Sequence, residues 1–246
     1  MSQSAAPQFN GPKSQVMAKS EVRQKIKAPT QNKPEPRNDR QRAFIDALWG
    51  GKSLTVVEGP AGTGKTYIPA VVGAYKLSRG DIKSIVVTSP CVGAGNSLGF
   101  RKGDVFEKMQ GWVAPITDTL SEIFGKEVVR GMFDHDILKL IPFEDLRGRS
   151  FDDSIIIADE CQNLTPAQMQ LFLTRSQEGS QTVVMGDLGQ IDIKGTSGLQ
   201  DLKERLAENP NSGLVEMVRF LPEDVVRSEL CKYAVGIYSQ ESPTGP

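Results

Sequence analysis

A glycine-rich loop between a predicted strand and a predicted helix limits the fold of this chain more than any other feature. Residues 59–66 have the sequence GPAGTGKT, a full match to the pattern G-x-x-x-x-G-K-[ST]. The β-branched run Leu54–Glu58 leads into the loop, and the apolar stretch Tyr67–Leu77, which has helical character, follows it. Glycines turn successive backbone N–H groups inward around phosphate oxygens, and the helix points its positive end at the same anion. The sequence therefore predicts a phosphate-binding loop formed by Gly59, Pro60, Ala61, Gly62, Thr63, Gly64, Lys65 and Thr66.

Two carboxylates at the end of another apolar run indicate what happens to the bound phosphates. Asp159 and Glu160 follow Ile155–Ala158, where a phosphate-loop enzyme needs a Mg²⁺-binding aspartate and a water-activating glutamate. We expect Lys65 to reach the β and γ phosphates and the Thr66 hydroxyl to ligate Mg²⁺. Alone, an apolar strand that ends in Asp-Glu is more often a solvated strand end. Together with the loop, the pair predicts nucleotide hydrolysis.

Polar side chains also follow the predicted strand 182–185. Asp187 and Gln190 lie just beyond it, at the edge where open α/β sheets bind ligands. Gln190 is a candidate sensor of the γ phosphate, with a turn residue as the alternative. Asp187 either hydrogen-bonds to the groups that bind the metal, without binding it directly, or caps the turn. The sequence leaves both interpretations open.

Short apolar runs alternate with helical segments along the rest of the chain. This alternation predicts a mostly parallel sheet with helices on both faces. Thr165 as N-cap and Pro166 at the first helical position mark one helix start, and Pro69 is expected to kink the helix after the loop. The other expected elements are strands at 85–88 and 214–220, an entry helix ended by Gly50-Gly51, a mostly helical region from 105 to about 138 broken near Gly125 and Gly131, and a closing helix at 222–233.

Charge is distributed unevenly, although the 246 residues sum to a net charge of −1. The first 40 residues hold eight basic and three acidic side chains, 8 − 3 = +5. Residues 1–36 are rich in Pro, Gln and Ser, so they bury too little apolar surface to offset their conformational entropy. We expect a disordered basic arm at 1–36, one domain at 37–240 and a tail at 241–246. The arm is either an electrostatic tether for nucleic acid or a partner, or a solvated extension.

Composition excludes several other classes of protein. One histidine cannot form a multi-histidine metal site, and three widely spaced cysteines without Cys-x-x-Cys argue against a disulfide scaffold or a zinc knuckle. The longest uncharged run, 84–100, is too short and too polar to span a bilayer. The N-terminus lacks the basic and then apolar pattern of a secretion signal. We therefore expect a cytoplasmic protein with no membrane association.

Together these motifs resemble the PhoH family, the phosphate-starvation-inducible ATP-binding proteins related to superfamily 1 helicases. The resemblance covers roughly residues 34–238. It implies a RecA-like fold, ATP with Mg²⁺, a ring-shaped homo-oligomer expected to be a hexamer, and a role on RNA. Besides the loop, it rests on Leu98–Phe100 with Gly103-Asp104, Arg147–Arg149, Asp159–Asn163, Phe172–Arg175, Gly186-Asp187 with 190–192, and Asp224–Arg227.

The resemblance also implies roles for two glutamines. Gln41 would contact adenine, with a surface helix residue as the alternative, and Gln162 would link the hydrolysis centre to conformational change. The chain departs from the family pattern at Ser89–Gly93, where the family has Arg-Pro-x-Val-Glu, and at Cys161, which replaces an alanine. The first departure falls where related helicases touch a nucleic-acid strand.

The single phosphate loop predicts that a second subunit completes the site. Superfamily 1 helicases hydrolyse ATP between two RecA-like units, and the second unit supplies an arginine to the γ phosphate. A ring of head-to-tail interfaces would supply it from a neighbour, and Arg175 and Arg227 are the candidates, with surface ion pairs as the alternative. The leading hypothesis is a Mg²⁺-dependent ATPase that acts at subunit interfaces on single-stranded RNA or DNA. A non-hydrolysing ATP-binding switch and a P-loop small-molecule kinase are the alternatives.

Overall fold

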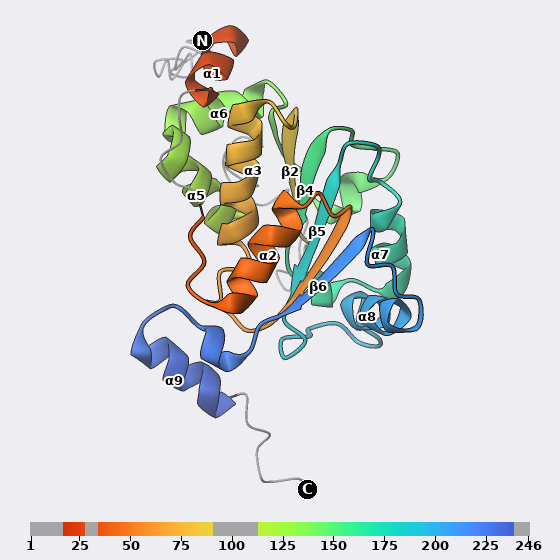
Figure 1. The fold of residues 1–246 in the computed structure, drawn as a ribbon. Helices are drawn as coiled ribbons and strands as arrows, with labels where there is room; N and C mark the ends of the chain where they lie inside the picture. Colours follow the sequence, from red (N-terminus) through yellow and green to blue (C-terminus); the bar gives the residue numbers. More distant parts are fainter. Residues whose placement is uncertain (1–16, 28–33, 91–112, 239–246) are drawn as a thin grey trace, which may run out of the picture.

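A six-stranded parallel sheet forms the centre of the molecule (Figure 1). The computed structural model describes residues 17–27, 34–90 and 113–238. Within these ranges the strand order is β3-β2-β4-β5-β1-β6, and neighbouring strands are parallel. The strands are β1 (Leu54–Glu58), β2 (Ser84–Thr88), β3 (Leu138–Leu140), β4 (Ser154–Ala158), β5 (Gln181–Gly186) and β6 (Val215–Arg219). The helices are α1 (Lys19–Ile26), α2 (Asp39–Trp49), α3 (Tyr67–Arg79), α5 (Ala114–Phe124), α6 (Lys126–Asp134), α7 (Pro166–Leu173), α8 (Gly198–Glu208) and α9 (Glu229–Tyr238), with short 3₁₀ turns η2 (Phe143–Leu146), η3 (Cys161–Asn163) and η4 (Pro222–Asp224).

Side chains along each strand alternate between two hydrophobic cores, one on either face of the sheet. Val57 of β1 and Ile157 of β4 belong to the core beneath α2 and α3, whereas their neighbours Val56 and Ile156 belong to the other. α2, α3, α5 and α6 cover the first face, and α7 and α8 cover the second (Figure 1). Because the four central strands β2, β4, β5 and β1 are mostly buried on both faces, they contain continuous apolar runs in the sequence. The predicted α/β fold, a mostly parallel sheet with helices on both faces, is confirmed.

Most predicted elements lie within a few residues of their expected positions. All five predicted strands are present, and α2 ends at Trp49, immediately before Gly50-Gly51. Thr165 and Gln168 form a capping box at the start of α7, with Pro166 at the first position. Pro69 is the third residue of α3, in the first turn, where helical N–H groups lack partners, and α3 continues to Arg79.

The predicted central helical region is only partly correct. It breaks at Gly125, whose φ of +89° favours glycine, but Gly131 lies inside α6. Its expected end near Leu138 is the edge strand β3, which has only three residues and therefore gives little periodic signal. α8 was not predicted, although Ser197 caps its first turn by accepting a hydrogen bond from the N–H of Gln200.

The expected closing helix at 222–233 is wrong in its position. A 3₁₀ turn occupies Pro222–Asp224, and α9 begins only at Glu229. Between them the N–H of Val226 donates to the carbonyl oxygen of Gly62 at 3.0 Å. A bond to the phosphate loop therefore replaces the bond that would have continued a helix.

Part of the predicted disordered arm is helical. α1 packs against α6, with Val22 and Ile26 buried between the two helices and the main core. A Cβ at Gly131 would lie 2.6 Å from Val22 Cγ2, so this glycine permits the close approach. The prediction of disorder is wrong for α1, because two apolar side chains at helical spacing are sufficient when a folded surface receives them.

Several sequence predictions fall on residues outside the described ranges. These are the arm residues 1–16 and 28–33, the tail 241–246, and the family motifs between 91 and 104. Where the structure does describe helices, none is long and apolar enough to cross a membrane.

Candidate nucleotide-binding site

The phosphate loop connects β1 to α3 at the carboxyl edge of the sheet. Gly62 and Gly64 have φ values of +87° and +89°, which favour glycine. Lys65 folds back over the loop, and its Nζ donates to the carbonyl oxygens of Gly59 and Pro60, the latter at 2.7 Å. A phosphate bound here would replace these carbonyl contacts of Lys65 with stronger charged ones.

Thr66 and Asp159 meet at this edge, although they lie on different segments. Thr66 Oγ1 donates to Asp159 Oδ2 at 3.0 Å. A hydroxyl, a carboxylate, water and phosphate oxygens are the ligands that Mg²⁺ takes in phosphate-loop proteins. The pair therefore fits a Mg²⁺–nucleotide complex, in which the substrate supplies part of the coordination. The described residues contain no group of three or more His, Cys, Asp or Glu side chains able to hold a metal.

Burial is the largest cause of the pKa shifts of Asp159 and Lys65. It raises the pKa of Asp159, and repulsion from Glu160 adds to the shift, while hydrogen bonds from the Glu160 N–H and the Thr66 hydroxyl oppose it. Burial also lowers the pKa of Lys65, against the attraction of Asp187, Asp159 and Glu160. Both shifts arise from charges held away from water, so a bound cation and a phosphate chain would stabilise the charged forms.

The buried side-chain amide of Gln162 holds Glu160 in place. Gln162 Nε2 donates to Glu160 Oε2 at 2.7 Å and contacts the carbonyl oxygen of Gln190 at 3.3 Å. Gln162 Oε1 accepts from the N–H of Asp187 at 3.1 Å. Glu160 itself has a φ of +57°, a backbone strain of about 1 to 3 kcal/mol for a residue other than glycine. The side-chain amide of Gln162 thus joins the exposed carboxylate of Glu160, a residue with a strained backbone, to the loop after β5.

Asp187 and Gln190 form a closed turn after β5. Asp187 Oδ1 accepts from the N–H of Gly189 at 3.0 Å, and its Oδ2 accepts from Gln190 Nε2 at 2.8 Å. The turn interpretation of Asp187 therefore accounts for both of its carboxylate oxygens. The sensor role of Gln190 stays a prediction, and its exposed side chain lies in the loop that Gln162 joins to Glu160.

A cavity of about 970 Å³ lies beside the loop and reaches Lys65, Thr66, Asp159 and Glu160. Gln41 also lines it, and its side chain is buried rather than on the helix surface. Gln41 Nε2 donates to the carbonyl oxygen of Thr63 at 2.9 Å, and its Oε1 accepts from the N–H of Arg37 at 2.9 Å. The surface alternative for Gln41 is therefore wrong, whereas contact with adenine stays a prediction.

Several residues that line the cavity were not predicted from the sequence, and Tyr67 and Arg37 are two of them. Tyr67 is 47% exposed and lines the cavity. Because it directly follows Thr66 in the sequence, its position next to the loop could have identified it as a site residue. Arg37 precedes α2 and also lines the cavity. No local motif identifies Arg37, because only the fold brings residues 34–37 to the phosphate loop.

The two candidate arginines lie at opposite edges of the sheet. Arg227 lines the cavity of its own chain. Arg175 follows α7, and its carbonyl oxygen accepts from the N–H of Phe151, just before β4 begins. It therefore lies at the amino edge of the sheet, away from its own loop. Of these two candidates, Arg227 is the one that lies near the nucleotide site of its own chain.

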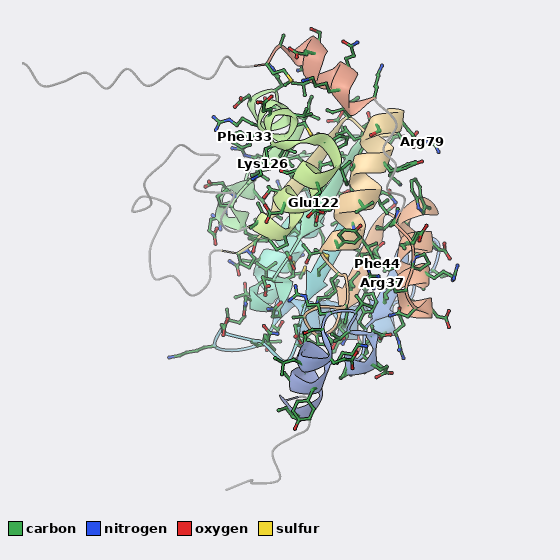
Figure 2. The ribbon with its side chains drawn as sticks, turned by 90° about the vertical axis from the view of Figure 1, so that its left-hand side faces the viewer. Arg37, Phe44, Arg79, Glu122, Lys126 and Phe133 are labelled. Carbon is green, nitrogen blue, oxygen red and sulfur yellow. The ribbon has the colours of Figure 1, made fainter. Side chains whose placement is uncertain are left out.

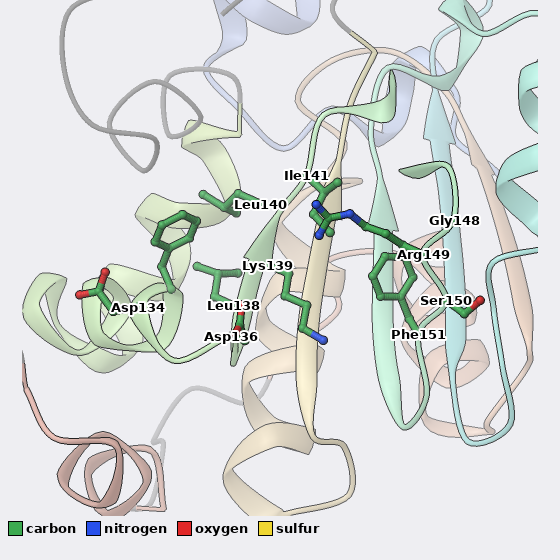
Figure 3. Close-up of a pocket in the computed structure, with 11 residues that line it drawn as sticks. Asp134, Asp136, Leu138, Lys139, Leu140, Ile141, Gly148, Arg149, Ser150 and Phe151 are labelled. Carbon is green, nitrogen blue, oxygen red and sulfur yellow. The ribbon is translucent and has the colours of Figure 1, made fainter. Parts of the chain in front are cut away.

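A second hollow, of about 810 Å³, lies beside the edge strand β3 (Figure 3). Asp134 and Asp136 line one part of it, and Lys139 and Arg149 line another. The Lys139 ammonium lies 5.8 Å from the centre of the Phe151 ring, and Arg149 Nε donates to the carbonyl oxygen of Asp145. This mixture of charges favours neither an anion nor a cation.

Comparison with known proteins identifies the family. A model described as "PhoH-like protein" matches residues 34–239. The chain is 40% identical over 204 residues to a PhoH-like protein of Bacillus subtilis, covering 82% of this chain and 63% of that protein. It is 39% identical over 207 residues to Protein PhoH of Escherichia coli, covering 82% of this chain and 57% of that protein. The chain thus spans about three fifths of the length of these relatives.

Among solved structures, the Pif1 helicase from Candida albicans matches with a TM-score of 0.34 and 14% identity, over 75% of this chain and 39% of that chain. The family model covers most of the chain, and the curated relatives share a third or more of its residues over that region. The chain therefore belongs to the PhoH family.

Proposed function

We propose that the protein is a Mg²⁺-dependent ATPase that hydrolyses ATP at the subunit interfaces of a homo-oligomeric ring. In this proposal turnover is coupled, as in helicases, to remodelling of single-stranded RNA or DNA in the cytoplasm. The observation that carries it is the 3.0 Å contact between Thr66 and Asp159, with Glu160 as the next residue. A binding loop alone serves many functions, but a metal-ligand pair beside an exposed carboxylate favours hydrolysis by water.

Each side chain has a distinct part in this proposal. The phosphate loop and Lys65 bind the β and γ phosphates. Thr66 and Asp159 would hold Mg²⁺, which would neutralise negative charge on the phosphate oxygens. Glu160 orients the attacking water and accepts its proton at a carboxylate oxygen. Gln162 keeps that carboxylate in one orientation through its 2.7 Å hydrogen bond. Gln41 contacts adenine, and Gln190 responds to the γ phosphate through the turn with Asp187.

The substitution Glu160→Gln tests the hydrolytic role. It should leave ATP binding within about twofold of wild type and lower turnover by at least about 10²-fold, the scale of a positioned general base. Glu178→Gln is the matched control, because Glu178 is exposed and its backbone contacts Asp153, before β4. Equal hydrolysis by Glu160→Gln and wild type would remove Glu160 from its role. ATP binding without turnover in wild type would favour the switch, and phosphoryl transfer to a metabolite would favour the kinase.

The nucleic-acid part of the proposal is supported by the family resemblance and by the excess of basic residues among the first 40. Phosphate contacts release counterions, so binding by such residues weakens as salt rises. ATP turnover should increase when RNA or single-stranded DNA is added, and the increase should shrink at higher salt. No stimulation by either polymer at low salt would contradict the coupling.

The ring is supported by the single phosphate loop and by the position of Arg175 at the far edge of the sheet. In a head-to-tail ring this edge can face the nucleotide of a neighbour. Arg175→Ala should lower turnover with little change in the protein's own nucleotide affinity. Native mass spectrometry together with a turnover assay tests the assembly, and a stable monomer with full activity would refute it.

A further inference from the structure

The segment between β6 and α9 lies against the phosphate loop. Contacts before and after its 3₁₀ turn η4 hold it in place. Arg40 of α2 forms an ion pair with the buried Asp224 at 3.0 Å. Asp224 Oδ2 in turn accepts from the N–H of Leu221 at 2.7 Å. Two residues after this anchor, the N–H of Val226 donates to the carbonyl oxygen of Gly62 at 3.0 Å. The backbone that leads to Arg227 is therefore held by the same chain that forms the loop.

Arg227 emerges from this segment directly over the middle of the loop. A Cβ at Gly62 would lie 3.0 Å from Arg227 Cδ and 3.2 Å from its Cγ. Glycine at position 62 therefore permits both the loop conformation, with φ at +87°, and the approach of the arginine stem. This contact joins residues that no local sequence pattern relates.

The guanidinium of Arg227 has no protein partner among the residues that the structure describes, where no hydrogen bond or ion pair involves it. It lines the same cavity as Lys65, Thr66 and Asp159. Two cations facing one cavity without a bound anion repel each other, and a polyphosphate would bind both.

We propose that Arg227 binds the phosphate chain of the nucleotide held by its own chain. It would then not serve as the arginine that one subunit supplies to the next. This inference rests on the nucleotide site of the proposed function and adds a residue to it. The planar fork of arginine suits two oxygens of one phosphate group, and the anchored segment places it without a second subunit.

Nucleotide affinity is the first test. Arg227→Ala should weaken binding of a non-hydrolysable ATP analogue by about 10- to 100-fold, as expected for hydrogen bonds to a charged group. Arg227→Lys should recover only part of that loss, because lysine keeps the positive charge but lacks the planar pair of N–H donors of the guanidinium. Arg79→Ala is the control, since Arg79 is exposed at the other end of α3 (Figure 2). Thermal unfolding should be unchanged in both Arg227 variants, because among the described residues the guanidinium has no hydrogen bond or ion pair to lose.

The outcomes separate this inference from the proposed function. If wild type does not bind the analogue, the proposed function fails. If wild type binds it and Arg227→Ala binds it equally well, only the role of Arg227 fails.

A mixing experiment tests whether Arg227 acts within its own chain. Lys65→Ala subunits lack a working loop but keep Arg227, whereas Arg227→Ala subunits keep the loop. If Arg227 served a neighbour, mixed oligomers would regain ATP turnover that neither variant shows alone. We expect no recovery, and recovery would overturn the assignment.

Discussion

Gln162 offers a sharp test of how the site holds its glutamate, because one substitution reverses a contact without changing side-chain size. In Gln162→Glu, a carboxylate oxygen replaces the Nε2 donor that lies 2.7 Å from Glu160 Oε2. Two carboxylates this close share a proton rather than ionise together. Two unit charges about 4 Å apart repel by about 4 kcal/mol at an effective dielectric constant of about 20, and by about 1 kcal/mol in bulk water. Gln162 is buried but Glu160 is exposed, so the penalty lies between these limits, which corresponds to about one to three pKa units.

The assay is ATP turnover as a function of pH. Since the shared proton is retained to higher pH, the acid limb of the Gln162→Glu profile should lie about one to three units above that of wild type. The folded state of the variant also binds more protons than its unfolded state, so its thermal stability should fall as pH rises through the shifted pKa. Gln162→Leu is the matched control. It loses about 1.5–3 kcal/mol with the charged hydrogen bond, but it adds no charge and should not move the acid limb. Identical acid limbs in Gln162→Glu and wild type would refute the contact.

Three further substitutions test other parts of the structure. Asp159→Asn should raise the melting temperature of the nucleotide-free protein at neutral pH, because burial and Glu160 disfavour the charged carboxylate, and it should abolish Mg²⁺-dependent nucleotide binding; a lower melting temperature would contradict this account. Gly131→Ala adds a Cβ 2.6 Å from Val22 Cγ2 and should speed amide exchange in α1, whereas Gly236→Ala, with open space at its Cβ, should not. Thr165→Ala removes the capping box of α7 and should cost about 1 kcal/mol in chemical denaturation; an unchanged unfolding free energy would argue against the cap.

The buried strands and the phosphate loop were predictable from the sequence, because burial and phosphate binding each restrict the residue types at successive positions. β4 is buried along its whole length and β1 is buried in its middle, so both contain an unbroken apolar run. α1 was not predictable from its composition, since only the surface of α6 and the absence of a side chain at Gly131 make its burial favourable. The closing helix was misplaced for a similar reason, because the bond from Val226 to the phosphate loop joins distant segments.

The α/β class, the phosphate loop and the candidate chemistry of Lys65, Thr66, Asp159 and Glu160 were predictable from residue types and their spacing alone. Phosphate and Mg²⁺ binding tolerate few residue types at fixed positions after a strand, so these roles can be recognised in the sequence. Two contacts become apparent only in the folded chain: Gln41 is buried against the loop, and Gln162 joins Glu160 to the turn after β5. The tertiary structure also separates the two arginines, with Arg227 beside the loop and Arg175 at the opposite edge. These positions depend on the order of strands in the sheet, which brings together segments that no sequence periodicity connects.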